Sequence, residues 1–201
     1  MDNSTVSVDF KLRIIAPYPE NSTASFKRGV LNWQQGQIED AIADFDAAIE
    51  SNPENSTAYV MRGVLNWQQG QIEDAIADFD AAIESNPEDA DAYYNRGIIK
   101  QALVELNAPV GIIAEHSDVT ADFDAAIEHN PEHVHAYFAK GCVNVKAGFL
   151  VAAAECFLIA LRLVEKTGTP SFKDEIEASL GDMPKSVIEH AEDSPWVRGE
   201  L

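Results

Sequence analysis

Positive charge and long apolar runs are both scarce in this sequence. It has 14 lysine and arginine residues against 34 aspartate and glutamate residues, a net charge of −20. This charge argues strongly against nucleic acid or an anionic membrane as partner, because like charges repel. No stretch approaches the ~20 apolar residues that span a membrane. Residues 1–10 lack the basic cluster and apolar run of a secretory signal, so we expect a cytoplasmic protein.

Motifs for catalysis and for metal binding are missing as well. The sequence has no glycine-rich phosphate loop, no nucleophile elbow and no Cys/His arrangement at a recognisable spacing. His129, His133 and His135 lie close together, but no paired cysteine or carboxylate signature accompanies them. The two cysteines, Cys142 and Cys156, are expected to be small apolar residues within helices. We therefore expect no enzymatic activity, no metal ion and no cofactor.

One stretch of 34 residues occurs twice. Residues 21–54 recur as residues 55–88 with three substitutions. The substitutions are Ser25 to Tyr59, Phe26 to Val60 and Lys27 to Met61. Self-similarity at this period is typical of repeat architectures, in which each unit buries its apolar face against its neighbours. The near identity is compatible with a natural or an engineered duplication. If the two copies differ in binding specificity, we expect the three substituted residues to cause the difference.

Each unit contains two segments with helical periodicity. In the second unit they are residues 59–69 and 71–85, separated by Gly70, a residue suited to ending a helix. The second segment has an apolar stripe at spacings of three and four, and acidic residues opposite it. Asn86 and Pro87 end it, because proline cannot continue a helix. The sequence thus predicts one helical hairpin per unit.

The aromatic, small and proline residues of a unit resemble the tetratricopeptide repeat. The second unit carries this pattern as Tyr59, Gly63, Gly70, Ala75, Phe79, Ala82 and Pro87. The first unit has Ser25 in place of the first aromatic residue. Later units repeat the pattern at Tyr93, Gly97, Phe123, Ala126 and Pro131, and at Tyr137, Gly141, Gly148, Ala153, Phe157 and Ala160. The resemblance implies an all-α fold, a right-handed α-solenoid of about four repeats with a C-terminal capping helix.

The repeats predict one elongated array over residues 20–166. Its units are 20–53, 54–87, 88–131 and 132–166. The third unit is ten residues longer than the period, with the insertion between Ile99 and Glu115, and it is either a tolerated longer hairpin or a binding element. Residues 167–201 are expected to form a capping helix, in which Phe172, Ile176 and Leu180 share a face, a short helical piece and a loose tail.

Residues 1–19 differ from the array. Val6, Val8, Phe10 and Leu12 alternate with polar residues, which is the periodicity of a strand. A lone strand has no sheet to join in a helical protein. The segment is therefore either a poorly ordered leader or an extended arm that docks in a groove or pairs with another copy.

The first helix of each unit carries more apolar surface than packing on its partner helix requires. In tetratricopeptide proteins the first helices line the concave side of the superhelix, so the resemblance implies that these residues form a groove. The predicted groove residues are Phe26, Val30, Trp33, Val60, Val64, Trp67, Tyr94, Ile98, Gln101, Phe138, Cys142 and Val145. The alternative is that both tryptophans pack between adjacent units.

A ladder of charged pairs is also predicted. Arg28, Arg62 and Arg96 recur in step with Asp44, Asp78 and Asp122, and an arginine near a packed helix crossing needs a carboxylate or carbonyl partner. In the fourth unit Lys140 and Cys156 occupy the corresponding positions. We expect the ladder to end there.

The composition of the predicted groove favours one class of partner. A clamp for a C-terminal carboxylate is disfavoured, because Lys27 and Asn95 alone could contribute to it. The leading hypothesis is a non-enzymatic protein–protein interaction scaffold that binds an apolar or amphipathic peptide or helix, with basic flanks that suit the acidic exterior. The second hypothesis is a self-assembling structural protein, a homo-oligomer in which the N-terminal arm or the C-terminal tail docks on a neighbouring copy.

Overall fold

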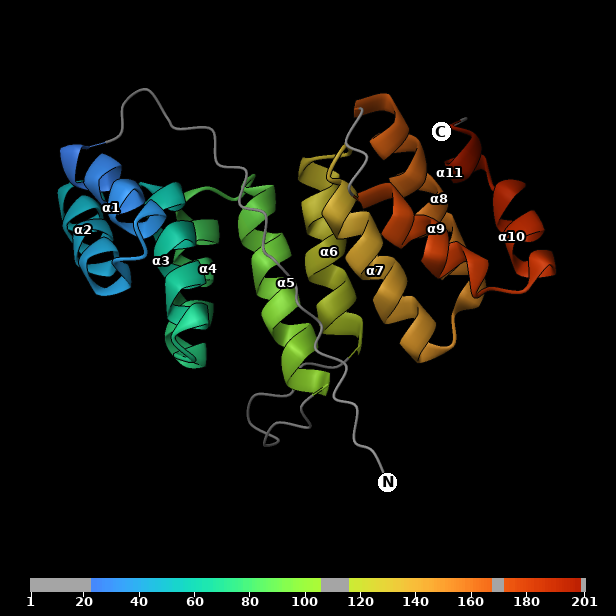
Figure 1. Cartoon of the computed structure of the whole chain (residues 1–201), viewed down its shortest axis with the longest axis horizontal. Helices are drawn as coiled ribbons and strands as arrows, with labels where there is room; N and C mark the ends of the chain where they lie inside the picture. Colours follow the sequence, from blue (N-terminus) through green and yellow to red (C-terminus); the bar gives the residue numbers. More distant parts are fainter. Residues whose placement is uncertain (1–22, 106–115, 168–171, 200–201) are drawn as a thin grey trace.

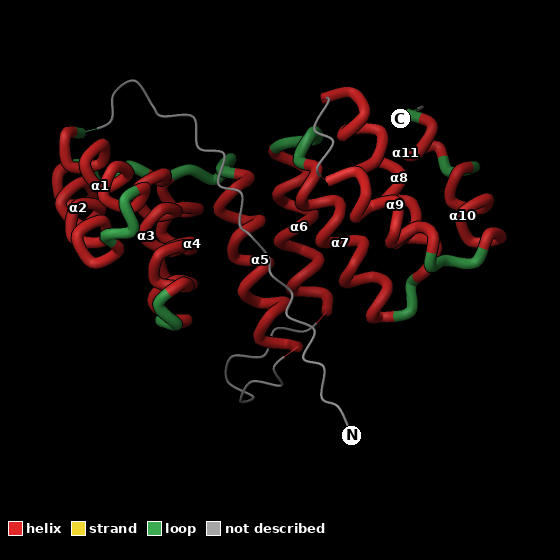
Figure 2. Tube along the Cα trace, viewed as in Figure 1, coloured by secondary structure: helices red, strands yellow, loops and turns green. Residues whose placement is uncertain are grey.

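The computed structural model describes residues 23–105, 116–167 and 172–199. Over these ranges the chain forms eleven helices and no strand (Figures 1 and 2). The predicted N-terminal arm, and residues 106–115 of the segment in which the insertion is predicted, lie outside the described residues. The array consists of α1 (Ala24–Gln34), α2 (Ile38–Ser51), α3 (Ser56–Gln68), α4 (Ile72–Ser85), α5 (Ala90–Glu105), α6 (His116–His129), α7 (Val134–Ala147) and α8 (Leu150–Thr167).

Consecutive helices pair as hairpins, and the hairpins stack along the long axis of the molecule (Figure 1). The core is accordingly divided into small clusters, and those of the first three units extend onto the first helix of the next unit. In the first cluster Phe26 and Phe45 pack with Met61 and Leu65 of α3. The α-solenoid expected from the sequence is confirmed, because each unit completes its core with its neighbour.

The two helices of each hairpin cross at a glycine. A Cβ added to Gly29, Gly63, Gly97 or Gly141 would come within 3.1 Å of the ring of a buried phenylalanine on the second helix, and at Gly141 within 2.5 Å of Phe157 Cε1. The four phenylalanines are among the largest fully buried side chains. The crossing therefore needs a residue without a side chain on the first helix.

Two further features shape each hairpin. Gly36, Gly70 and Gly148 follow the first helices of units one, two and four with φ near +75° to +83°, a backbone conformation that glycine adopts without steric cost. Several first helices begin with a capping side chain, and in the second unit Asn55 Oδ1 accepts a hydrogen bond from the Ala58 N–H at 3.2 Å. These caps and turns set where each helix starts and ends.

The C-terminal end of the array is covered by α9 (Lys173–Gly181), α10 (Lys185–Glu192) and α11 (Pro195–Arg198). Ile176 and Leu180 of α9 are buried in one cluster with residues of α7 and α8, which confirms the expected capping helix. The tail is not loose throughout as expected. Its last described turn is helical because Val197 is buried, while the adjacent Trp196 is 66% exposed.

We predict that Gly141→Ala destabilises the protein by about 1–3 kcal/mol, the usual cost of overpacking a core. The matched control is Gly181→Ala, also in a helix, where an added Cβ meets no atom within 4 Å. Alanine propensity should make this control neutral or stabilising by up to about 1 kcal/mol. Urea unfolding of both variants measures the difference, and equal midpoints would contradict the importance of the close crossing.

Candidate functional site

The predicted groove residues differ widely in exposure. Seven are buried between helices, four are half-buried, and Val145 of α7 is 40% exposed. The half-buried residues are Trp33, Trp67, Tyr94 and Cys142, and the buried ones are Phe26, Val30, Val60, Val64, Ile98, Gln101 and Phe138. The buried seven contribute to packing, so the accessible apolar surface is narrower than the sequence indicated. Apart from Gln101, these buried positions pack in the core clusters of the array.

Both tryptophans combine packing with exposure. Trp33 packs against the cluster of the first unit and Trp67 against that of the second, yet each keeps part of its surface accessible. Tyr94 of α5 lies beside Phe123 and His133, with ring centroids 6.1 and 4.9 Å away, and burial raises the pKa of its hydroxyl. These rings pack partly against the core clusters and keep part of their surface accessible.

His133 and His135, two of the clustered histidines, make contacts within the folded protein. His133 Nδ1 accepts a hydrogen bond from the Ala136 N–H at 3.1 Å, and its Nε2 lies 3.2 Å from Asp91 Oδ1. The His135 ring packs on Phe172, with 4.9 Å between centroids. Within the described ranges no three His, Cys, Asp or Glu side chains are arranged to hold a metal ion.

The two cysteines lie in environments that suppress thiol chemistry. Cys156 is buried and Cys142 is half-buried, and neither forms a disulfide. Burial raises the pKa of each thiol to about 11, so both remain protonated at neutral pH and are poor nucleophiles.

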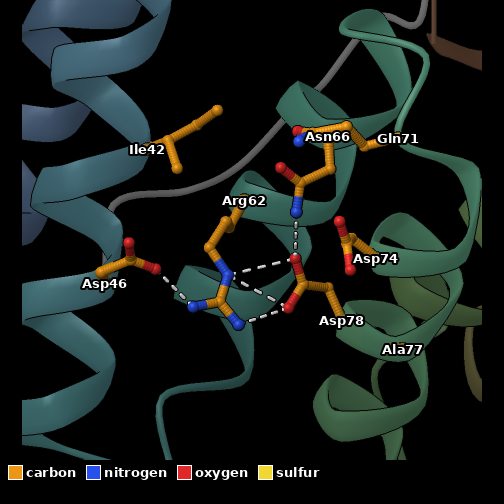
Figure 3. A pocket seen from close by; sticks show the side chains of 8 residues that line it. All are labelled: Ile42, Asp46, Arg62, Asn66, Gln71, Asp74, Ala77 and Asp78. Atoms are coloured by element: carbon orange, nitrogen blue, oxygen red, sulfur yellow. Dashed lines mark hydrogen bonds and ion pairs between the residues drawn. The ribbon is translucent and has the colours of Figure 1, made fainter.

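The predicted ladder of charged pairs is present and joins neighbouring units (Figure 3). Arg62 Nε lies 3.1 Å from both carboxylate oxygens of Asp78, and Asn66 Nδ2 donates to the same carboxylate at 2.8 Å. The other side of the Arg62 guanidinium pairs with Asp46, from α2 of the preceding unit. The arginine therefore bridges two repeats.

The same bridge recurs along the array. Arg96 pairs with Asp122 of its own unit and with Asp80 of the preceding unit at 2.6 Å. The expectation that the ladder ends in the fourth unit is half wrong. Cys156 removes the pairing within that unit, but Lys140 still pairs with Asp124 of the unit before it. The sequence signal for these bridges is a constant spacing of 16 residues between the aspartate and the basic residue.

In the first unit the arginine pairs within its own unit, and no pairing with a preceding unit occurs among the described residues. Within the described residues Arg28 pairs with Asp44 of its own unit, and its side chain is 64% exposed, against 24% for Arg62. The hydrogen bond from Arg28 lowers the pKa of the Asp44 carboxyl. At Asp78 burial has the larger effect and raises the pKa. The interior pair is thus held in a drier environment than the pair at the end of the array.

A cavity of about 340 Å³ adjoins the interior pair (Figure 3). Its wall includes Ile42 and Asp46 of α2, Arg62 of α3 and Asp74 of α4. Arg62 already has two carboxylate partners there, so it is not available to an anionic ligand. We assign this site to the joint between units.

Comparisons with known proteins agree with this geometry. The tetratricopeptide repeat family model matches residues 12–56 and 26–85, and a second, TPR repeat, matches residues 67–104. The chain is a tetratricopeptide repeat protein. Among curated protein sequences none matches significantly.

Solved structures share the fold of this tetratricopeptide repeat protein. A crystal structure of MamA is 24% identical with a TM-score of 0.62, over 75% of this chain and 82% of that one. The first TPR of Spaghetti (RPAP3), bound to the HSP90 peptide SRMEEVD, is 18% identical with a TM-score of 0.54, over 62% and 90%. The TPR2B domain of yeast Sti1, in complex with pHsp70, is 20% identical with a TM-score of 0.53, over 68% and 95%.

The helices of this repeat protein stack on one another. Of the described helices, none is both long and apolar enough to cross a membrane. Of the predicted groove residues, Trp33, Trp67, Tyr94, Cys142 and Val145 keep accessible surface.

We predict that Arg62→Met lowers the free energy of unfolding by about 3 kcal/mol, because it leaves Asp78 buried without its counter-charge. Arg28→Met is the matched control, since units one and two are nearly identical in sequence and Arg28 is exposed. It should cost much less. Chemical unfolding compares the two, and a double variant of Arg62 and Asp78 tests the coupling. Equal losses at Arg28 and Arg62, or strictly additive losses in the double variant, would contradict the bridge.

Proposed function

We propose that this protein is a non-enzymatic interaction scaffold that binds an apolar or amphipathic peptide or helix on its concave side. The observation that carries the proposal is the row of half-buried side chains from consecutive first helices, Trp33, Trp67, Tyr94 and Cys142, continued by the exposed Val145. Rings that keep an accessible edge gain contact area at low entropic cost when a partner covers them.

Peptide binding by proteins of the same fold supports this function. The structures of Spaghetti and yeast Sti1 contain an HSP90 peptide and pHsp70. The HSP90 peptide SRMEEVD carries three acidic residues, whereas the present chain has a net charge of −20. A partner with basic flanks matches this charge better, because it is attracted rather than repelled.

Peptide binding tests the groove. We expect Lys-flanked amphipathic peptides to bind more tightly than the same peptides with Glu flanks, and more weakly as salt rises. Val145→Ser should weaken binding about fivefold, since it removes part of one apolar contact. Fluorescence anisotropy of labelled peptides gives the affinities.

The control for this experiment is Leu31→Ser. Leu31 is a similarly exposed apolar residue, at 52%, but it lies on the end of the array and should not affect peptide affinity. Equal binding by wild type and Val145→Ser, or a preference for Glu-flanked peptides, would contradict the proposed groove.

A second function, self-assembly, is favoured by the outer face of α1. Leu31 is 52% exposed, whereas its equivalents Leu65, Ile99 and Val143 are buried, each beside the preceding unit. The face of α1 has the composition of an internal joint without a preceding unit among the described residues. The N-terminal arm or the C-terminal tail of another copy would find apolar surface there.

Light scattering on the full chain tests assembly. If the arm holds copies together through this face, deleting residues 1–19 and substituting Leu31→Asp should each reduce the mass in solution to that of one chain. Asp at this position disfavours a buried contact because its charge would be desolvated. A full chain that is already monomeric, or a mass unchanged by the deletion, would rule out assembly through the arm.

A further inference from the structure

The joints between neighbouring units share one pattern of contacts on the first helix. Each joint has a basic residue that pairs with an aspartate of the preceding unit, and a buried aliphatic residue three positions later. The basic residues are Arg62, Arg96 and Lys140, and the buried residues are Leu65, Ile99 and Val143. In every case the aspartate directly follows the buried phenylalanine of the preceding second helix. One carboxylate and one apolar surface therefore define what a first helix accepts from its neighbour.

The helix α1, at one end of the stack (Figure 1), carries the same pattern on an open face. Arg28 and Leu31 have the same spacing, but the Arg28 side chain is 64% exposed and Leu31 is 52% exposed. Ala24 is exposed as well, whereas its equivalent Ala58 is buried. Spacings of four and three place Ala24, Arg28 and Leu31 on one side of the helix. These three residues form the α1 stripe, a joint surface without a preceding unit among the described residues.

Arg28 uses one side of its guanidinium. Its Nε and Nη2 donate to Asp44 of its own unit, and its Nη1 has no partner within the described part of the chain. In Arg62 the Nη1 atom pairs with an aspartate of the preceding unit. Lys27, next to the stripe, replaces the buried Met61 and adds a second exposed positive charge. The sequence of α1 contains no acidic residue, so the stripe is a local site for a carboxylate in a chain of net charge −20.

A second copy of the chain does not match this surface. Two α1 stripes brought together would oppose basic residues and leave both arginines without a carboxylate. The other end of the array has Leu158 in place of the aspartate, and α9, α10 and α11 pack on α8 there. The aspartates inside the array already pair with their own next unit. Residues 1–19 have two basic and two acidic side chains, so their side-chain charge gives no net attraction to a basic stripe.

We propose that the α1 stripe is a docking site for an amphipathic helix of a partner protein that carries an Asp or Glu beside its apolar face. The carboxylate accepts hydrogen bonds from Arg28 Nη1, as Asp46 does from Arg62 in the interior joint, and the apolar residues cover Leu31. This site adds a second binding surface to the proposed scaffold and does not depend on the groove.

The helix α2 gives the expected spacing and supplies a probe. Ile42 lies four residues before Asp46 and Ile49 lies three residues after it, and both isoleucines are partly buried against the cluster that joins the first two units. A labelled peptide with the sequence of residues 38–51, held helical by a staple on its outer face, is therefore the probe. Its control is the same peptide with Asp46→Asn, which removes the charge and keeps the shape.

Fluorescence anisotropy with the full chain measures docking. The unmodified sequence should bind about fivefold more tightly than the Asp46→Asn peptide, because the charged pair is lost. In Arg28→Met the two peptides should bind equally. Leu31→Ser should weaken both about fivefold, since apolar contact is removed. Val145→Ser, in the groove, is the matched control and should leave both affinities unchanged. All three substituted residues are exposed, so the variants should fold.

Equal binding of the two peptides to the wild type, no binding by either, a charge preference that persists in Arg28→Met, or binding unaffected by Leu31→Ser would overturn the proposal. If binding appears only after residues 1–19 are deleted, the chain's own N-terminal segment is the occupant. If the probe lowers the mass of the full chain in light scattering, a second copy is the occupant. Each of these two results makes a partner protein wrong. Groove peptides that still bind in a Val145-dependent manner while the helix probe fails would leave the scaffold function intact.

Discussion

The structure depends on one close contact in each unit, between a glycine of the first helix and a buried phenylalanine of the second. The contact also places the charged ladder, because the arginine precedes the glycine and the aspartate precedes the phenylalanine. When Gly63 meets Phe79, Arg62 is brought to Asp78. In the fourth unit the charged pair is lost while the glycine and the phenylalanine remain. Packing at the crossing is thus the stricter requirement.

The three substitutions between the first two units acquire a different meaning from the one that the sequence suggested. Met61 is buried, whereas its equivalent Lys27 is exposed at the end of the array. Tyr59 lies 5.6 Å from the Arg62 guanidinium, and its equivalent in the first unit is Ser25, without a ring. At two of the three positions the polar residue lies in the first described unit and the larger aromatic or apolar residue lies at an internal joint, whereas Phe26 and Val60 are both buried. A terminal repeat needs a polar outer face for solubility.

Periodic features of this protein could be predicted from its sequence, and the features that depend on the spacing of units could not. The hairpins, the capping helix and the pairs such as Arg62–Asp78 follow from residue types at fixed intervals. Burial of the predicted groove residues depends on how closely neighbouring hairpins approach one another. This distance cannot be deduced from the sequence of a single unit. Val64 is buried in the core, whereas Val145, also a valine on a first helix, is exposed. The bridge from Arg62 to Asp46 could have been predicted from the sequence, because its spacing of 16 residues recurs along the chain.

The third unit shows how a repeat array can lengthen one hairpin without losing its fold. Its insertion lengthens the hairpin, but Gly97 still meets Phe123 and Arg96 still bridges to Asp80, so the crossing and the joint to the preceding unit are kept. What changes is the apolar residue near the turn, which is Ile72 in the second unit and His116 in the third. Where the period is kept, buried carboxylates such as Asp78 have their hydrogen-bond partners. At the break, Gln101 Oε1 has no hydrogen-bond partner among the described residues. Loop lengthening costs little in free energy, so the array can depart from its period in this unit while the crossing and the joint are kept.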